Sequence, residues 1–581
     1  MARLGWGALA LMAVGLPLLT ANTYYLYVGA SVALLTVVTA GLNVLVGFTG
    51  QISLGHAGFY AIGAYTAALL VVRAGIHPVG AAAAAILLAA VAGAGVAGAA
   101  LRVTGPYLAM VTIAFGIIVE GLLVEWVSVT GGPGGIFNIP KLPLQRHYWI
   151  ILAAAAAALW HVANLRRSAW GRAFLAVRGS EVAAESLGLS AYYVRIVAFT
   201  VSAAFAGAGG ALFAFLNGYV SPDSFTLQTS IVFLLALLFG GEGRVAGPAV
   251  GSLVLTLLPE LLTGMADYRL ILYGGLLLLS IYWLPSGVVG AVSRGGAEGW
   301  DGVLLPATAG QPDLRTTGGS GGEGESSRKL LRVEDLRLSF GGVAALADVS
   351  LSVPDRGIHA VIGPNGAGKT TLLNVLSGYY APSGGSVWLE DGSVAGRPPY
   401  AIARLGVART FQTTQLFGGL SVLENVAVGV AGPRLGGVLP ALLGTPGTRR
   451  REREVRRSAL SLLGVIGLSE WADRPADALP AGLRRKLEIV RALATHPRLL
   501  LLDEPAAGLS PREIEELDRQ LTSLRDRGGP AIVLVEHHMD LVMAVSERIT
   551  VLDYGRVIAC GTPEVVRRDP AVVEAYLGVA T

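Results

Sequence analysis

Charged residues are distributed so unevenly along this chain of 581 residues that no single kind of domain suits both halves. Residues 1–300 contain 13 Lys and Arg and 9 Asp and Glu, whereas residues 301–581 contain 31 of each sign. A segment of that length with so few charges is too apolar for a water-soluble domain, and the second half has an ordinary soluble composition. The sequence therefore predicts a membrane-embedded part followed by a soluble part.

The charge balance and the cysteine content exclude two further classes of protein. The net charge of +4 arises entirely in the apolar half, so the basic residues are assigned to membrane loops and no nucleic-acid partner is expected. Cys560 is the only cysteine, which excludes an intramolecular disulfide and fits a reducing compartment for the soluble part.

The first half contains ten apolar runs that approach the roughly 20 residues a helix needs to cross a bilayer. Because some runs are short, we expect eight to ten spans in an all-α polytopic membrane domain over residues 1–294. The first run alone is compatible with a signal peptide, but further spans follow, which favours an uncleaved helix. The runs are 4–20, 25–46, 53–72, 79–101, 107–127, 148–163, 196–216, 228–241, 247–263 and 269–284.

The Lys and Arg between these runs fall mostly on one side of the membrane. Threading ten spans with the first residue inside puts nine of them inside and four outside. Positive residues favour cytoplasmic loops, so we predict a cytosolic first residue in a multi-pass protein of the cytoplasmic (inner) membrane. An even number of spans returns the chain to the cytosol, which is where the soluble half is then expected.

Three other segments of the sequence suggest local structure. In the longest inward loop, Gly171–Gly188 is expected to form one short amphipathic helix that ends at a glycine; a simple positive-inside anchor is the alternative. Gly55, Gly58 and Gly63 are expected to let helices approach closely. Residues 295–328 are rich in Gly, Ser, Thr and Pro, which predicts a flexible linker before a soluble domain over 329–581.

A phosphate-binding sequence lies near the start of the second half. The apolar run 357–362 leads into GPNGAGKTT and then into helical text. Glycines there let backbone N–H groups turn toward phosphates, Lys369 reaches the β and γ oxygens, and Thr370 holds Mg²⁺. The predicted nucleotide-binding residues are Gly363, Pro364, Asn365, Gly366, Ala367, Gly368, Lys369, Thr370 and Thr371.

Two more apolar strands end in residues suited to phosphoryl transfer. Leu499 to Leu502 precede Asp503, which can hold the metal, and Glu504, which can polarise the attacking water. Ala531 to Val535 precede Glu536 and His537, which places an imidazole near the γ-phosphate. The carboxyl ends of strands in a parallel sheet are where ligands bind, so we predict one site with Glu504 and His537 as its catalytic residues.

With these motifs in place, residues 330–581 resemble the ATP-binding subunit of an ABC transporter. The segment LPAGLRRKLEIVRAL lies where that family has its signature motif, upstream of LLLLDEP. The resemblance implies an α/β P-loop ATPase that uses ATP and Mg²⁺, with a helical subdomain between Gln412 and Leu479. It also implies that Phe340 stacks on adenine, that Gln412 is the lid glutamine near the metal, and that His537 is the switch histidine.

The same resemblance implies that a working site needs two such domains. In that family the signature of one subunit, here Leu479 to Leu483 with Ala481 and Gly482, covers the ATP held by another. This sequence departs from the usual LSGGQ at Pro480 and Leu483, and Ser510 replaces the usual aspartate. The L-P form, EPAAGL, and VEH followed by MDLVM are similar to the ATPase subunits of branched-chain amino-acid importers.

The membrane half resembles the permease of those importers along most of 25–285. The segments GLNVLVGFTGQISLGHAGFYAIGAY, GPYLAMVTIAFG, TGGPGGI and LFGGEGRVAGPAVG carry that similarity. It implies a permease fused to its ATPase, with Gly171–Gly188 as the coupling helix. It also implies an extracytoplasmic substrate-binding protein as a partner.

The leading hypothesis is an ATP-driven importer for branched-chain or related small amino acids. The alternatives are a urea or short-amide importer, a half-size exporter and a non-transport ATPase on a membrane anchor. Importers of this kind use two permeases and two ATPases. Because the departures at the signature would weaken both sites of a homodimer, we expect a heteromer with a second permease subunit and a second ATP-binding subunit.

Overall fold

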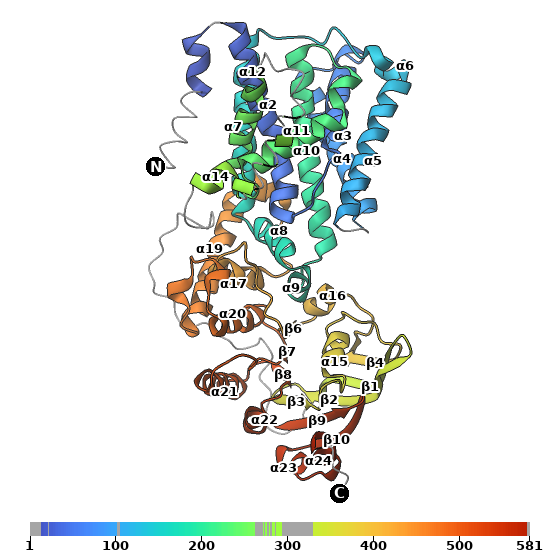
Figure 1. Cartoon of the computed structure of the whole chain (residues 1–581), viewed down its shortest axis with the longest axis vertical. Coiled ribbons are helices and arrows are strands. Elements are labelled where there is room, and N and C mark those ends of the chain that lie inside the picture. The colour runs from blue at the N-terminus through green and yellow to red at the C-terminus, as the bar shows by residue number, and fades with distance from the viewer. Residues whose placement is uncertain are drawn as a thin grey trace. The chain divides into compact units, whose positions relative to one another are not determined.

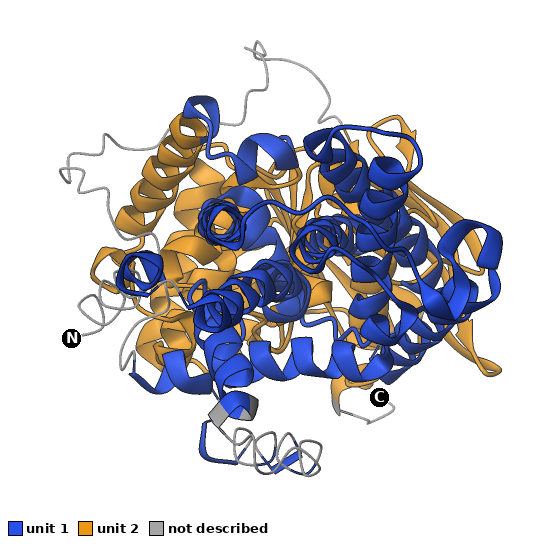
Figure 2. Ribbon diagram, turned by 90° about the horizontal axis from the view of Figure 1, so that it is seen from above, with its two compact units in different colours: residues 1–178, 192–300, 436–448 blue, residues 179–191, 301–435, 449–581 orange. Residues whose placement is uncertain are grey.

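The computed structural model describes residues 13–20, 22–101, 105–261, 271, 274–275, 278, 282–284, 286–292 and 329–577. The chain forms two compact units, coloured separately in Figure 2. The helical unit comprises residues 1–178, 192–300 and 436–448, and the sheet unit comprises residues 179–191, 301–435 and 449–581. The expected linker, 295–328, lies outside the described residues.

Eight helices of the helical unit coincide with expected spans, and Figure 1 shows them running alongside one another. They are α2 (Thr23–Leu42), α3 (His56–Val72), α4 (Pro78–Ala100), α5 (Pro106–Glu125), α7 (Leu144–Arg166), α10 (Ala191–Asn217), α11 (Leu227–Gly240) and α12 (Gly247–Leu261). The expected spans 4–20 and 269–284 lie largely outside the described residues.

Length separates these helices into two groups. Among the described residues, five helices are long and apolar enough to cross a membrane: α2 with its π-helical extension η1 (Asn43–Phe48), α4, α5, α7 and α10. Helices α3, α11 and α12 are shorter. The remaining elements of this unit are α6 (Val127–Thr130), η2 (Gly132–Gly134), α8 (Ala169–Gly179), η3 (Pro222–Phe225), α14 (Gly287–Val292) and α18 (Val438–Leu442).

Glycines permit the close helix approaches that the sequence predicts. A Cβ atom on Gly55 would lie 2.0 Å from the carbonyl oxygen of Thr112, and one on Gly63 would lie 2.2 Å from that of Gly207. A Cβ on Gly58 would lie 2.9 Å from the ring of Phe115. Backbones therefore touch at Gly55 and Gly63, and an aromatic ring packs onto Gly58, because small residues are what allow such close contacts in a membrane.

His56 begins α3 as a packed residue. Its ring is buried, with Nδ1 2.8 Å from Oγ of Ser53 and Nε2 2.7 Å from Oγ of Ser202. Both ring nitrogens are thus satisfied by serine hydroxyls. The residues before it, between Phe48 and His56, interrupt the helical backbone.

The expected single helix over Gly171–Gly188 is wrong: the segment forms two helices. Helix α8 ends at Gly179, and α9 (Glu181–Ser186) begins after Ser180. Ser180 has extended backbone angles, and its hydroxyl accepts a hydrogen bond from the N–H of Ala183 at 3.2 Å. A serine N-cap of this kind starts a new helix and so breaks the run.

The sheet unit contains two sheets. One is antiparallel, in the order β2 (Val343–Pro354), β1 (Lys329–Phe340), β4 (Gly384–Leu389), β5 (Gly392–Ser393). The other has the order β10 (Arg556–Gly561), β9 (Arg548–Asp553), β3 (Ile358–Ile362), β8 (Ala531–Val535), β7 (Leu499–Asp503), β6 (Val407–Arg409). In the second sheet all neighbours from β9 to β6 are parallel, and β10 is antiparallel to β9.

Helices lie between and around these strands (Figure 1). They are α15 (Lys369–Leu376), α16 (Pro399–Arg404), α17 (Val422–Ala431), α19 (Pro446–Val465), η5 (Ser469–Trp471), η6 (Ala476–Ala478), α20 (Ala481–Leu493), α21 (Pro511–Asp526), α22 (Met539–Val545), α23 (Pro563–Val566) and α24 (Pro570–Leu577). The expected α/β ATPase fold is confirmed, and helices fill the region expected to be a helical subdomain.

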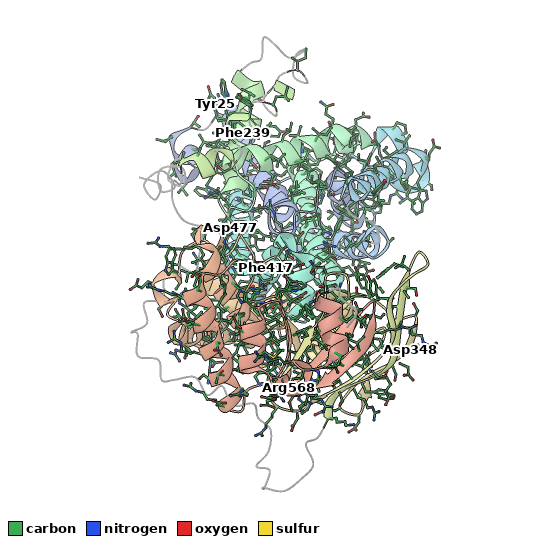
Figure 3. All side chains as sticks on the ribbon, turned by 60° about the horizontal axis from the view of Figure 1, so that its bottom comes forward. Tyr25, Phe239, Asp348, Phe417, Asp477 and Arg568 are labelled. Atoms are coloured by element: carbon green, nitrogen blue, oxygen red, sulfur yellow. The ribbon has the colours of Figure 1, made fainter. Side chains whose placement is uncertain are left out.

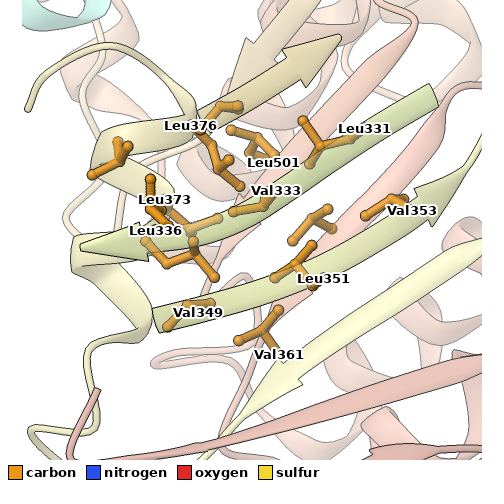
Figure 4. Packing of buried hydrophobic residues seen from close by; sticks show 14 of the residues in the cluster. Leu331, Val333, Leu336, Val349, Leu351, Val353, Val361, Leu373, Leu376 and Leu501 are labelled. Carbon is orange, nitrogen blue, oxygen red and sulfur yellow. The ribbon is translucent and has the colours of Figure 1, made fainter. Parts of the chain in front are cut away.

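Alternate residues of the central strands enter two different cores. Leu499 and Leu501 of β7 pack with β1, β2 and α15, a cluster shown in Figure 4. Leu500 and Leu502 of the same strand pack with residues of α20, α21 and α22. A parallel strand covered on both faces needs a continuous apolar sequence, which is why LLLL precedes the polar residues of the site.

A buried cation–π contact ties the helical subdomain to α20. Phe417, labelled in Figure 3, is fully buried, and the guanidinium of Arg491 lies 4.5 Å from its ring centroid. Burial lowers the pKa of Arg491 to about 10, and Glu488 opposes that shift. The aromatic face stabilises a cation that is otherwise removed from water.

The substitution Gly63→Ala tests the helix contacts. The added methyl group would overlap the backbone of Gly207, so we expect a loss of about 1–3 kcal/mol of stability and a lower melting temperature in detergent. Gly95→Ala is the matched control, because no atom lies within 4 Å of a Cβ at that position in α4. Equal melting temperatures for the two variants would contradict the packing described here.

Candidate nucleotide-binding site

Three neighbouring parallel strands end at one edge of the larger sheet and bring the predicted motifs together. Gly363 follows β3, Glu536 follows β8, and Asp503 is the last residue of β7. Val535 is paired with both Val361 and Asp503, so the three strand ends are in register. This is the edge at which parallel α/β sheets bind ligands.

The loop between β3 and α15 has the backbone of an anion-binding loop. Gly363, Gly366 and Gly368 have φ values of 150°, 84° and 100°, a region that glycine adopts readily. Lys369 is the first residue of α15, and its Nζ donates to the carbonyl oxygens of Gly363 at 2.7 Å and Pro364 at 2.9 Å. Backbone N–H groups at a helix N-terminus and a buried ammonium together favour phosphate.

The pKa of Lys369 is affected by the nearby carboxylates. Burial lowers the pKa of its ammonium, and the negative charges of Glu504 and Asp503 oppose that shift.

Asp503 is almost fully buried beside a buried arginine. Its Oδ2 accepts from Nη2 of Arg409 at 3.1 Å, and Arg409 also donates to Asn374 at 2.6 Å and Ser377 at 2.7 Å. Burial raises the pKa of Asp503, while Arg409 lowers it. Within the described part of the chain, Oδ1 of Asp503 has no hydrogen-bond partner.

That unpaired oxygen fits a hard cation. Mg²⁺ is bound through one or two protein oxygens together with phosphate oxygens and water, rather than by a full cage of carboxylates. No cluster of three or more His, Cys, Asp and Glu with metal-binding geometry occurs among the described residues. The hydroxyl of Thr370 and Oδ1 of Asp503 are thus a suitable protein set.

Glu504 lies at the centre of a small hydrogen-bonded group. Nε2 of Gln412 donates to its Oε2 at 3.0 Å, and Nε2 of His537 lies 2.8 Å from its Oε1. The backbone φ of Glu504 is 47°, in the left-handed region that a non-glycine residue occupies at a cost. The structure thus brings Gln412 and His537 to Glu504, although they are 92 and 33 residues away from it in sequence.

The other predicted site residues lie outside this hydrogen-bonded group. Phe340 ends β1, is 46% exposed and makes an edge contact with Tyr380 at 5.1 Å between ring centroids. Pro480 precedes α20, and Ala481 and Gly482 open that helix with their backbone N–H groups at its N-terminus. Ser510 caps α21 through a reciprocal capping box with Glu513.

Three buried charged residues at the site are not predicted from the sequence: Arg409, Arg485 and Glu488. Glu536 is predicted at its strand end, but without a role. Glu536 accepts from the backbone N–H groups of Ala506, His537 and His538 at 2.6, 2.8 and 3.2 Å. It therefore ties the ends of β7 and β8 together. In the amphipathic segment AGLRRKLEIVRAL, Arg485 and Glu488 look like an ordinary exposed pair three residues apart, so the sequence gives no signal of their burial.

Comparison with known protein families matches three parts of this chain. Residues 24–281 match the model of the permease component of branched-chain amino acid transport systems. Residues 346–507 match the ABC transporter model, and residues 556–581 match that of the branched-chain amino acid ATP-binding cassette transporter.

Individual relatives cover both halves. The high-affinity branched-chain amino acid transport ATP-binding protein LivG of Salmonella typhimurium is 46% identical over 254 residues, which cover 44% of this chain and all of that protein. This chain belongs to the branched-chain amino acid ABC transporter family. The system permease protein LivM of Escherichia coli is 36% identical over 280 residues, which cover 43% of this chain and 66% of that permease.

In this branched-chain amino acid ABC transporter, a permease and an ATP-binding cassette are joined in one chain. The second half is an ABC-type ATPase domain that binds nucleotide, and the first half makes the chain a membrane protein. A nucleotide-free ATP-binding cassette of known structure is 32% identical and covers 44% of this chain and all of that chain, with a TM-score of 0.38. The urea, exporter and anchored-ATPase alternatives are not favoured.

Proposed function

We propose that this chain imports branched-chain amino acids across the cytoplasmic membrane and drives that transport by hydrolysing ATP at Glu504. The observation that carries the proposal is the position of the Glu504 carboxylate. Glu504 directly follows β7, which is separated in the sheet from the P-loop strand β3 by β8. Its two carboxylate oxygens are oriented by Gln412 and His537. LivG, which this chain covers completely, is named for branched-chain amino acid transport.

In the proposed hydrolysis, each group of the site has its own role. Glu504 takes a proton from a water molecule as the water oxygen attacks the γ-phosphorus, and the bond to the β–γ bridging oxygen breaks to give ADP and phosphate. Lys369 and the N-terminus of α15 offset the charge on the phosphate oxygens. His537, whose Nε2 lies 2.8 Å from Oε1 of Glu504, would hold that carboxylate in place and contact the γ-phosphate.

Mg²⁺ supplies charge neutralisation on the β and γ oxygens when it is bound. Thr370 and Asp503 would hold it, with Gln412 completing the set from the lid loop. Burial raises the pKa of the Asp503 carboxyl, and the guanidinium of Arg409, 3.1 Å away, opposes that rise. The ion pair with Arg409 thus favours the carboxylate form that the metal requires.

The proposed assembly contains a second permease and a second ATP-binding subunit. Phe340 would stack on the adenine of the ATP bound to this chain, since its ring is half exposed at the end of β1. Ala481 and Gly482 would address the ATP of the second subunit with backbone N–H groups at the N-terminus of a 13-residue helix. Pro480 offers no hydroxyl there, which supports a heteromer whose other site is conventional.

The proposed path for substrate starts at an extracytoplasmic binding protein and ends in the cytosol. The chain would lie with its first residue and its ATPase domain inside, as the distribution of Lys and Arg favours. The loop segment 179–191, which includes α9, belongs to the sheet unit, where Oγ of Ser180 donates to Oε1 of Gln415 at 3.0 Å. We propose that α9 is the coupling helix.

Glu504→Gln tests the hydrolytic role. The amide keeps the shape of the side chain but cannot take a proton, so we expect ATP binding to persist while hydrolysis falls by at least a hundredfold, about 2.7 kcal/mol of barrier. Lys369→Ala should instead weaken nucleotide binding. Hydrolysis by the Glu504→Gln protein within tenfold of the unmodified rate would show that another group activates the water.

Cysteine labelling tests the orientation. In a Cys560→Ser background, a single cysteine replaces either Tyr219, which is 47% exposed after α10, or Arg167, which is exposed after α7. An impermeant maleimide added to spheroplasts should label the first position at once and the second only after permeabilisation. The opposite pattern would reverse the proposed topology.

A further inference from the structure

Arg485 is a buried cation that donates hydrogen bonds to the backbone around Glu504. It lies in the second turn of α20 and is only 4% exposed. Its Nη2 donates to the carbonyl oxygens of Asp503 at 2.5 Å and Glu504 at 2.7 Å, and its Nε donates to that of Pro505 at 3.4 Å. One guanidinium therefore holds three successive peptide groups.

These contacts fall at the strained point of the loop. Glu504 has a φ of 47°, and its N–H donates to the carbonyl oxygen of Val535 at 2.8 Å. A left-handed glutamate persists only where its surroundings hold it. Because Val535 and Arg485 hold the two peptide groups that flank its Cα atom, they also fix the direction in which the carboxylate leaves the backbone.

Glu488 extends the same arrangement to the lid loop. Its Oε2 accepts from Nη1 of Arg485 at 2.6 Å, and its Oε1 accepts from the backbone N–H groups of Phe411 at 3.3 Å and Gln415 at 3.2 Å. Nη1 of Arg485 also donates to the carbonyl oxygen of Phe411. The two residues that flank the loop around Gln412 are thereby fixed to the same ion pair as Glu504.

We propose that Arg485 and Glu488 form a positioning pair that sets the distance between the Gln412 loop and the carboxylate of Glu504. The inference rests on the proposed role of Glu504 and adds two residues that act on it through its own backbone and through the Gln412 loop. A buried ion pair alone adds little stability over an apolar pair of similar volume. Here each charge is used, because the hydrogen bonds that each side chain makes beyond the pair go to the backbone of one of the two loops. Oε1 of Glu488 also lies 4.0 Å from Nη2 of Arg491.

The helix that carries the pair gives it a second consequence. Helix α20 starts at Ala481, the segment proposed to address the ATP of the second subunit, and Arg485 follows one turn later. The same rigid element therefore holds the proposed contact to one ATP and the backbone of the residue that hydrolyses the other. A shift of α20 on engagement would reach Glu504 through Arg485.

The test measures hydrolysis and binding separately, on the full-length chain in lipid nanodiscs together with the subunits that copurify. For Arg485→Gln we expect kcat to fall at least tenfold. Its Kd for a fluorescent methylanthraniloyl ATP and its number of ATP-binding sites should each stay within threefold of the unmodified values. Arg485→Lys keeps the charge and should recover part of that loss. Glu488→Gln keeps an acceptor oxygen for the lid loop and should have a smaller effect than Arg485→Gln.

Arg498→Gln is the matched control, because Arg498 also pairs with a glutamate at 2.7 Å, but on the surface. It should leave kcat unchanged. A kcat for Arg485→Gln within threefold of the unmodified value, or a parallel loss of ATP binding, would overturn the positioning role. If Arg485→Gln does not fold, Arg485→Lys and Glu488→Gln decide: unchanged kcat in both overturns it. Glu504→Gln run alongside separates this outcome from failure of the proposed function, which normal hydrolysis by that variant would indicate.

Discussion

The adjacency of β3, β8 and β7 in one parallel sheet is the constraint on which the site depends. Each strand ends in a different chemical group: the phosphate-binding loop, the Glu536 and His537 pair, and the Asp503 and Glu504 pair. Because the strands are parallel and in register, these groups meet at one edge without any long loop to position them. Buried Arg409 then pairs with the carboxylate of Asp503, and buried Arg485 holds the backbone of Asp503 and Glu504.

The membrane part depends on a different constraint, which is the absence of side chains at helix contacts. In lipid, helices gain no hydrophobic driving force from one another, so close van der Waals contact must hold them together. Gly63 against Gly207, and Gly55 against Thr112, provide that contact. The ring of His56, buried among these helices, is satisfied by the hydroxyls of Ser53 and Ser202.

Much of this arrangement is predictable from the sequence, because its signals are local. The apolar run before Gly363 and the LLLL before Asp503 each predict a buried strand, and the polar residues that follow predict a shared edge. The close contacts at Gly55, Gly58 and Gly63 follow from residue size alone. Although these motifs are dozens of residues apart in sequence, each strand can be predicted from its own pattern.

The features that the sequence does not predict depend on tertiary contacts or on a single capping residue. Ser180 splits the expected helix over Gly171–Gly188 because its hydroxyl bonds to the N–H of Ala183, and one serine is a weak signal against a helical pattern. Arg485 and Glu488 are typical of an exposed helix face in sequence. Only the fold shows that their partners are backbone groups of loops 74 and 18 residues away.

Uptake by the assembled transporter tests the central claim most directly. Proteoliposomes would contain the full-length chain with its copurifying permease and ATP-binding subunits, ATP on the side of the ATPase domain, and the cognate binding protein on the other side. We predict accumulation of radiolabelled leucine that requires ATP and is lost when Glu504 is replaced by glutamine. Accumulation that is unchanged by that replacement, or ATP-dependent uptake of urea in place of leucine, would contradict the account.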